Sequence, residues 1–183
     1  MPAAIFLDRD GVIIENRSNY VRDWSDVEFI PSAVQALAKY SISPFRFVLV
    51  TNQSAVGRGI ISLSTAQAIN ERVVADLKKN GCRIDGVFMC PHKPEDNCAC
   101  RKPKPGLLLQ AADLLSIDLA KSLLVGDAWT DLQAGFAAGI PTLSLVLTGR
   151  GQEQLKHKSP SELVDAYVHH DLYDALHSLL NHS

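Results

Sequence analysis

The sequence of 183 residues has no long apolar run and almost no excess of charge of one sign. The net charge is −2 and the 18 Lys and Arg residues are scattered, so we expect neither nucleic-acid binding nor attachment to a membrane surface. No apolar stretch is as long as a transmembrane helix, and residues 3–7 are too short for a signal peptide because the run ends at Asp8. These absences predict a cytoplasmic protein.

Cysteine is also scarce, with four residues in the chain, but three of them lie in one short segment. Four residues of metal-ligand type stand within eleven positions of this segment: Cys90, His92, Cys98 and Cys100. Their number and spacing predict a closed tetrahedral zinc site, while buried cysteines beside a surface histidine are the alternative. This usage indicates thiols that are kept reduced for a metal rather than a disulfide framework.

Short apolar runs alternate with segments of helical periodicity. We expect buried strands over Ala3–Leu7, Phe47–Val50, Ser122–Val125 and Thr142–Leu147. We expect helices over Ser32–Tyr40, Ser64–Lys79, Gly106–Leu115, Thr130–Ala138 and Leu172–Leu180. Such alternation predicts an α/β fold with three layers, a Rossmann-like, doubly wound parallel sheet covered by helices on both faces. A chain of 183 residues with 46% hydrophobic residues suits one core, so we expect residues 1–183 to form a single domain.

Three of the predicted strands end in side chains that can do chemistry. Asp8 and Asp10 follow the first strand, Thr51 follows the second, and Asp127 follows the third. In an open parallel α/β sheet, ligands bind outside the carboxyl ends of the strands. Residues far apart in sequence are therefore expected to meet in one crevice.

The pair Asp8 and Asp10 indicates phosphoryl chemistry. Two carboxylates two residues apart at a strand end can face the same side, and Gly11 allows a sharp turn there. One can attack phosphorus while the other, when protonated, donates to the leaving oxygen. Holding both together calls for a hard cation such as Mg2+, to which Asp127 offers a further oxygen. The pair alone also fits an N-cap with a solvated turn.

Hydroxyl groups, amides and cations follow at positions that suit an anion. The segment Thr51–Ser54 can grip phosphoryl oxygens, and Arg58 stands on a flexible loop between two glycines. Arg101 and Lys102 come directly after the cysteines, and a lysine here supplies the positive charge that phosphoryl transfer needs. Each of these features alone also fits a polar turn or a surface cation.

The ordered set of motifs resembles the haloacid-dehalogenase superfamily of aspartyl phosphatases. The set is Asp-x-Asp-Gly-Val, a strand ending in Thr, then Lys, then Gly-Asp-x-x-x-Asp. Phe6–Gly11, Thr51–Ser54 and Cys90–Gly106 are also similar to the heptose 1,7-bisphosphate 7-phosphatases and to their relatives, the histidinol-phosphatases. The resemblance extends from Ile5 to about Gly149 and implies a haloacid-dehalogenase-like fold without a large cap domain. The resemblance also implies a zinc-bound loop over about residues 88–106, which we expect to lie over the site as a partial lid.

The resemblance implies a Mg2+-dependent phosphatase, expected to be a monomer, that removes the 7-phosphate of D-glycero-D-manno-heptose 1,7-bisphosphate through an aspartyl-phosphate. The implied catalytic residues are Asp8 as nucleophile, Asp10 as general acid and then base, and Thr51 and Lys102 around the phosphoryl group. The implied metal ligands are Asp8, the Asp10 carbonyl and Asp127 for Mg2+, and Cys90, His92, Cys98 and Cys100 for zinc. The implied substrate contacts are Tyr20, Asn52, Gln53, Ser54, Arg58 and Arg101.

Three positions depart from the pattern of the heptose bisphosphate enzymes. Ala128 stands where Lys usually follows Gly-Asp, Val12 where Thr is more usual, and residues 17–19 replace a Gly-containing turn. Histidinol phosphate or another small sugar phosphate therefore stays open as the alternative substrate. A non-enzymatic zinc module is the alternative of another class, but it gives no reason for carboxylates at successive strand ends.

Overall fold

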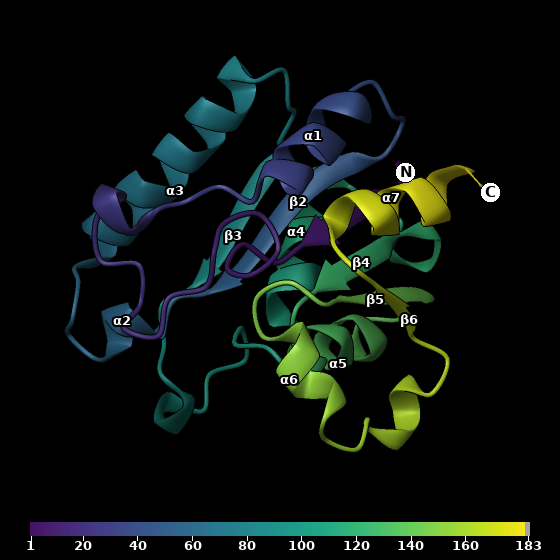
Figure 1. Ribbon diagram of the computed structural model, residues 1–183. Helices are drawn as coiled ribbons and strands as arrows, with labels where there is room; N and C mark the ends of the chain where they lie inside the picture. Colours follow the sequence, from purple (N-terminus) through teal and green to yellow (C-terminus); the bar gives the residue numbers. More distant parts are fainter. Residues whose placement is uncertain (182–183) are drawn as a thin grey trace.

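The computed structural model describes residues 1–181 and contains a six-stranded parallel sheet between layers of helices (Figure 1). The strands are β1 (Ala4–Leu7), β2 (Arg46–Asn52), β3 (Gly86–Cys90), β4 (Leu123–Gly126), β5 (Thr142–Val146) and β6 (Tyr167–His169). Their order across the sheet is β3-β2-β1-β4-β5-β6, and every neighbouring pair is parallel. The chain thus winds outward in both directions from β1, which confirms the predicted doubly wound sheet.

Seven α-helices are described along residues 1–181. They are α1 (Pro31–Lys39), α2 (Ser54–Gly57), α3 (Leu63–Lys79), α4 (Gly106–Leu115), α5 (Trp129–Ala137), α6 (Gly151–Leu155) and α7 (Leu172–Asn181). Short 3-10 turns lie at Trp24–Asp26, Pro94–Asp96, Leu119–Lys121 and Ser161–Leu163. No helix of this part of the chain combines the length and the apolar character that a membrane crossing requires.

The alternation of side chains along β1 explains the three layers. Ile5 and Leu7 belong to one buried cluster, which α1, α3 and α7 cover, while Ala4 and Phe6 belong to a second cluster under α4 and α5. Successive side chains of a strand point to opposite faces, so a fully apolar strand requires cover on both sides. All four residues of β1 are buried, as expected of the strand from which the winding starts.

The four predicted strands and five predicted helices are present, with bounds that differ from the predictions by only a residue or two. The sequence reading missed β3 and β6, which lie at the two edges of the sheet. β6 is three residues long and mostly exposed, so it has no continuous apolar run. β3 does contain an apolar run, Val87–Cys90, but Cys90 was interpreted only as a metal-ligand candidate and the run was not assigned as a strand. The short helices α2 and α6 were also not predicted.

The segment between β1 and α1 forms a flap instead of a large cap domain. Its backbone pairs Asp10 with Ile14 and Ile14 with Phe29 in two isolated bridges. The side chains of Val12, Ile13 and Ile14 are buried within the core cluster under α1. The flap is therefore anchored to the core at its base, and its outer residues remain beside the carboxyl ends of the strands.

The central position of β1 predicts a large loss of stability when its core side chains are truncated. Ile5→Ala should lower the free energy of unfolding by about 2–5 kcal/mol, because Ile5 is fully buried and the surrounding sheet can relax only partly. The same change at Ile42, which is 93% exposed, should alter it by no more than about 0.5 kcal/mol. Urea denaturation of both variants checks this, and equal effects at the two sites would contradict the assigned core.

Candidate active site

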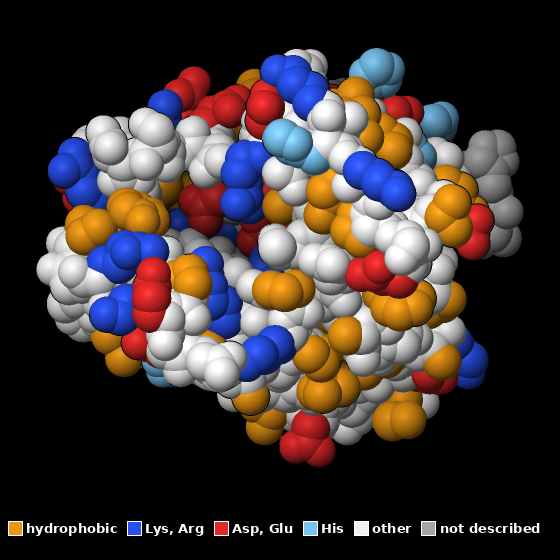
Figure 2. All heavy atoms as spheres, turned by 90° about the horizontal axis from the view of Figure 1, so that it is seen from below, with side chains coloured by type: hydrophobic (Ala, Val, Ile, Leu, Met, Phe, Trp, Pro, Cys, Tyr) orange, Lys and Arg blue, Asp and Glu red, His pale blue; other side chains and the backbone are white. Residues whose placement is uncertain are grey.

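A cavity of about 440 Å3 lies at the carboxyl ends of β1, β2 and β4. Fifteen residues line it: Asp8, Asp10, Asn16, Arg17, Ser18, Tyr20, Val21, Asn52, Gln53, Ser54, Arg101, Lys102, Thr130, Asp131 and Arg150. Figure 2 shows this face of the molecule hollowed, with acidic side chains deep in the hollow and Lys and Arg side chains around it. The predicted convergence of strand ends on one crevice therefore occurs.

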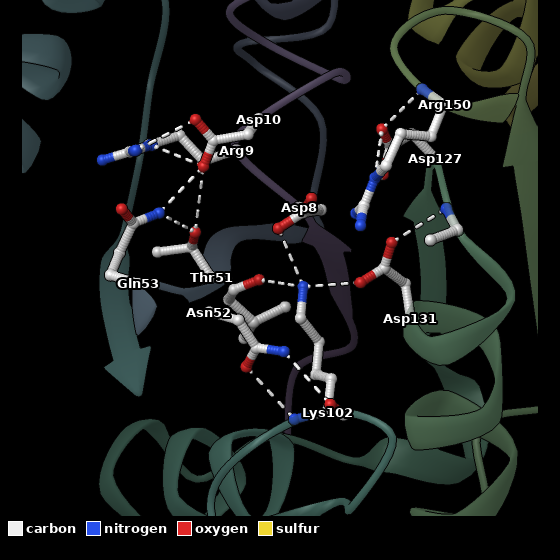
Figure 3. Close-up of polar contacts among 12 residues, drawn as sticks. Asp8, Arg9, Asp10, Thr51, Asn52, Gln53, Lys102, Asp127, Asp131 and Arg150 are labelled. Atoms are coloured by element: carbon white, nitrogen blue, oxygen red, sulfur yellow. Dashed lines mark hydrogen bonds and ion pairs between the residues drawn. The ribbon is translucent and has the colours of Figure 1, made fainter. Parts of the chain in front are cut away.

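A buried ammonium group lies at the floor of the cavity. Lys102 Nζ donates to Asp8 Oδ1 at 2.8 Å and to the Val50 carbonyl at 2.7 Å, and it lies 2.7 Å from Asp131 Oδ1 (Figure 3). All three charged side chains are almost completely buried. Asp8 directly follows β1, Asp131 is in the first turn of α5, and Lys102 comes from the loop before α4, so three distant segments meet at one cation.

Burial perturbs these ionisable groups strongly. It raises the pKa of Asp8 to about 7 despite the opposing attraction of Lys102, and the neighbouring carboxylates Asp131 and Asp127 raise it further. Burial by itself would lower the pKa of Lys102, but the attraction of Asp131 and Asp8 outweighs it and raises that pKa. Lys102 is therefore charged at neutral pH, whereas the ionised form of Asp8 calls for more positive charge than one lysine supplies.

The Asp10 carboxylate is held by donors on the side of β2. Its Oδ2 accepts from Gln53 Nε2 at 2.8 Å and from Arg9 Nε at 3.2 Å, and Thr51 Oγ1 lies 3.5 Å away. Its Oδ1 accepts from Arg9 Nη2 at 3.0 Å. The side chain is 20% exposed and lines the cavity, so it is both anchored and open to a ligand.

Asp127 lies on the side of Asp8 that faces away from Asp10, and it is paired with Arg150 (Figure 3). Arg150 Nη2 donates to Asp127 Oδ1 at 2.8 Å, and the backbone N–H of Arg150 donates to Asp127 Oδ2 at 2.8 Å. Burial raises the pKa of Asp127, although Arg150 acts against the shift. Gly11 has φ +84°, and a Cβ there would clash with the Asp127 carboxylate. The glycine is thus required by both backbone conformation and space.

The carboxylates offer a set of oxygens that suits a hard cation. Ligand oxygens of Asp8, Asp127 and Asp131 all lie within 4.8 Å of one another. Mg2+ binds through oxygen ligands, and burial raises the pKa of Asp8 and of Asp127, so a bound cation would stabilise their ionised forms.

The four zinc-ligand candidates are brought together in the loop after β3. The Cys90 Sγ atom lies 3.0 Å from Cys100 Sγ, 3.5 Å from Cys98 Sγ and 3.6 Å from His92 Nδ1. A tetrahedron with Zn–S bonds of about 2.3 Å has ligand atoms about 3.8 Å apart. The cluster is therefore slightly tighter than a zinc tetrahedron. Its three sulfur atoms and one imidazole nitrogen are ligands that zinc prefers.

Two amides that were predicted to contact substrate bond catalytic candidates. The Asn52 side chain makes two bonds of 3.1 Å with the Lys102 backbone, one to its N–H and one to its carbonyl. Gln53 Nε2 bonds both Asp10 and Thr51 at 2.8 Å. Asn52 and Gln53 also line the cavity, with both polar atoms of Asn52 and the nitrogen of Gln53 bonded to protein groups.

The remaining predicted substrate residues divide into two groups. Tyr20, Ser54 and Arg101 line the cavity. Arg58 is not among the lining residues, and its guanidinium lies 3.8 Å from Glu95 of the zinc loop. The structure therefore does not bring Arg58 into the cavity.

The sequence reading missed two arginines of the site. Arg150 follows Thr148-Gly149 just after β5, so the strand-end rule used for the first three strands, applied to the fourth, indicates it. Arg17 lines the cavity from the flap, where its Nε donates to the Asp26 carbonyl at 2.8 Å. No sequence pattern marks Arg17, because its place depends on how the flap folds back.

Comparison with known proteins agrees with this geometry. Residues 99–175 match the family described as HAD-hydrolase-like. The chain is 42% identical over 154 residues to the D-glycero-beta-D-manno-heptose-1,7-bisphosphate 7-phosphatase of Vibrio cholerae, which covers 80% of this chain and 82% of that protein. The enzyme of the same name from Escherichia coli K12 is 40% identical over 154 residues, 80% of each chain.

A solved structure resembles the whole chain. The crystal structure of D,D-heptose 1,7-bisphosphate phosphatase from B. bronchiseptica, complexed with magnesium and phosphate, matches with a TM-score of 0.90 and 36% identity over 99% of both chains. Since sequence identity of about 40% and the same fold extend over most of the molecule, this chain belongs to the family of the D-glycero-beta-D-manno-heptose-1,7-bisphosphate 7-phosphatases, which are HAD-like phosphatases.

Proposed function

We propose that this chain is a Mg2+-dependent phosphomonoesterase that removes the 7-phosphate of D-glycero-β-D-manno-heptose 1,7-bisphosphate through an aspartyl-phosphate. The observation that carries the proposal is the buried Asp8 carboxylate, 2.8 Å from Lys102 Nζ at the floor of a cavity, in a chain of this family. A carboxylate beside a fixed ammonium can attack phosphorus while the ammonium neutralises phosphoryl oxygens.

In the first step, an oxygen of Asp8 forms a bond to phosphorus as the bond from phosphorus to the sugar oxygen breaks. Asp10 in its protonated form gives its proton to that sugar oxygen, so the sugar leaves as a neutral alcohol. Lys102 and Thr51 lie beside the two carboxylates and stabilise the charge that spreads over the transferring group.

In the second step, Asp10, now ionised, takes a proton from water as the water oxygen attacks phosphorus. The bond between Asp8 and phosphorus breaks, inorganic phosphate leaves, and Asp8 is a carboxylate again. One residue thus serves as acid and then as base, as proton balance over the two steps requires.

Asp8, Asp127 and the Asp10 carbonyl are the proposed Mg2+ ligands, with Asp131 close behind. When bound, Mg2+ supplies positive charge that offsets the repulsion among these carboxylates and the phosphoryl oxygens. The magnesium and phosphate in the B. bronchiseptica crystal structure support this proposal.

The second phosphate of a bisphosphate needs cations away from Asp8. Ala128 provides none, but Arg17, Arg101 and Arg150 all line the cavity. Arginine pairs well with phosphate because its donors form a planar fork. These three side chains support a small phosphosugar with two anionic groups as the substrate.

The zinc loop is proposed to hold one structural Zn2+ through Cys90, His92, Cys98 and Cys100. Arg101 Nη1 donates to the His92 carbonyl at 3.1 Å, so the loop ties a metal ligand to a cavity-lining residue. None of the four cysteines is in a disulfide, and three of them as zinc thiolates would suit a reducing compartment such as the cytoplasm.

Asp8→Asn tests the nucleophile. We expect kcat to fall by at least about 10³-fold. Removal of the nucleophile of a serine protease lowers kcat by about 10⁶-fold, so this lower limit is conservative. Steady-state phosphate release measures it, with circular dichroism to verify folding. The matched control is Asp113→Asn on the exposed face of α4, which should keep full activity. Retained turnover in Asp8→Asn would contradict the assignment.

A substrate panel tests the specificity. We expect kcat/KM for the β anomer of heptose 1,7-bisphosphate to exceed that for histidinol phosphate and fructose 1,6-bisphosphate by at least about a hundredfold, or about 2.7 kcal/mol in transition-state binding. Phosphate release with Mg2+ from each compound, and from the α anomer, measures it. A preference for histidinol phosphate would replace the proposed substrate by the alternative.

Loss of a zinc ligand should reduce both stability and activity, because metal binding is coupled to folding of the loop that carries Lys102. We expect one zinc per chain in the native protein and less than one in Cys98→Ser, with lower kcat in that variant. Cys82→Ser, outside the cluster, should retain zinc and activity. Metal analysis of freshly reduced protein checks this, and zinc-free wild type with full activity would contradict it.

A further inference from the structure

Arg9 is buried behind the active site. Its side chain is 1% exposed and is the largest fully buried side chain described. Its Nε and Nη2 atoms donate to the two oxygens of Asp10 at 3.2 and 3.0 Å. This two-point grip fixes the plane of the Asp10 carboxylate as well as its position.

Arg9 is in turn held by Asn70, in the middle of α3. Arg9 Nη1 donates to Asn70 Oδ1 at 2.7 Å, and Asn70 is 5% exposed. The other end of that amide donates to Met89 Sδ at 3.4 Å, and a thioether is a weak acceptor. Asn is less favourable than Ala inside a helix, so its strong bond to Arg9 explains its place there.

We propose that Asn70, acting through Arg9, is a positioning residue that aims the Asp10 carboxylate at the leaving oxygen. The inference rests on the proposed function, in which Asp10 is the general acid. Oδ2 of Asp10 accepts from both Gln53 and Arg9, whereas Oδ1 accepts from Arg9 within the described chain. Both oxygens therefore bond the one guanidinium, and its orientation sets that of the carboxylate.

Asn70 is too far back to touch the substrate. It does not line the catalytic cavity and instead lines a groove between α3 and β3. Without its amide, one N–H of Arg9 has no acceptor in a buried site, so the guanidinium must turn to find one. The Asp10 carboxylate turns with it, because both of its oxygens bond the same guanidinium.

A misaimed general acid has a distinctive kinetic effect. Proton donation matters most when the leaving group is a strong base, such as a sugar alkoxide, and least when it is an acidic phenol. The quantity kcat/KM includes the steps up to departure of the leaving group. A loss of Asn70 should therefore make log kcat/KM fall more steeply with the pKa of the leaving phenol.

The experiment uses the full chain with Mg2+ and a series of aryl phosphates, from phenyl phosphate to 2,4-dinitrophenyl phosphate. Asn70→Ala should lower kcat/KM at least about tenfold for phenyl phosphate, whose phenol has a pKa near that of tyrosine, about 10. It should lower the value less than about twofold for the dinitrophenyl compound. In an Asp10→Asn background, Asn70→Ala should cause no further loss.

Two matched controls separate position from helix damage. Gln67→Ala removes an exposed amide one turn earlier on α3, and Met89→Leu removes the weaker partner of Asn70 at nearly constant volume. Both should leave the leaving-group dependence unchanged. Arg9→Lys keeps the charge but loses the planar fork, so it should reproduce the steeper dependence and carries the test if Asn70→Ala fails to fold.

The outcomes distinguish a failure of the positioning role of Asn70 from a failure of the proposed phosphatase function. An equal loss for all aryl phosphates in Asn70→Ala, or an additive loss on top of Asp10→Asn, would overturn the positioning role. Wild-type protein that releases no phosphate from heptose 1,7-bisphosphate or from any aryl phosphate would overturn the proposed function itself. A steeper dependence in Asn70→Ala and Arg9→Lys, absent in the two controls, would establish the role.

Discussion

One buried ammonium group joins the parts on which the site depends. Lys102 Nζ contacts Asp8 after β1, the Val50 carbonyl in β2 and Asp131 in α5, while its own backbone belongs to the zinc loop. Taking these charges out of water is costly, and the cost is offset only when each group is paired and hydrogen-bonded. No side-chain nitrogen or oxygen that is buried within residues 1–181 lacks a hydrogen-bond partner, so the condition is met.

The need to hold Lys102 still gives a reason for four candidate metal ligands to stand beside the cavity. The loop after β3 has few buried side chains of its own, so apolar burial can do little to order it. Two glycines let it approach its neighbours closely: a Cβ at Gly57 would crowd the Lys93 backbone, and one at Gly106 would clash with the Ala99 carbonyl. A Zn2+ ion bound between these contacts would supply the rigidity that the apolar core cannot supply, and the Asn52 amide then fixes the Lys102 peptide.

The inner strands could be predicted because their sequences require burial on both faces. The edge strand β6 could not, since its three residues are mostly exposed and form no continuous apolar run. The apolar run Val87–Cys90 of β3 was missed because its last residue belongs to the metal-ligand cluster. The catalytic candidates at the strand ends were found for the same reason as the inner strands, because the parallel topology brings those ends together. Arg150 obeys the same rule after β5 and was missed because the rule was applied to three strands only.

Residue type and spacing determined what chemistry this protein can carry: two carboxylates after one strand, a lysine after a cluster of soft metal ligands, and a further acid after a third strand. These signals are local, so the sequence by itself was enough to find them. Only the tertiary structure decided which groups pair, as when Arg58 faced Glu95 and Asn70 reached Arg9 across 61 residues. Pairings of that kind depend on how α3, the flap and the zinc loop pack against the sheet, and packing joins residues without regard to their separation along the chain.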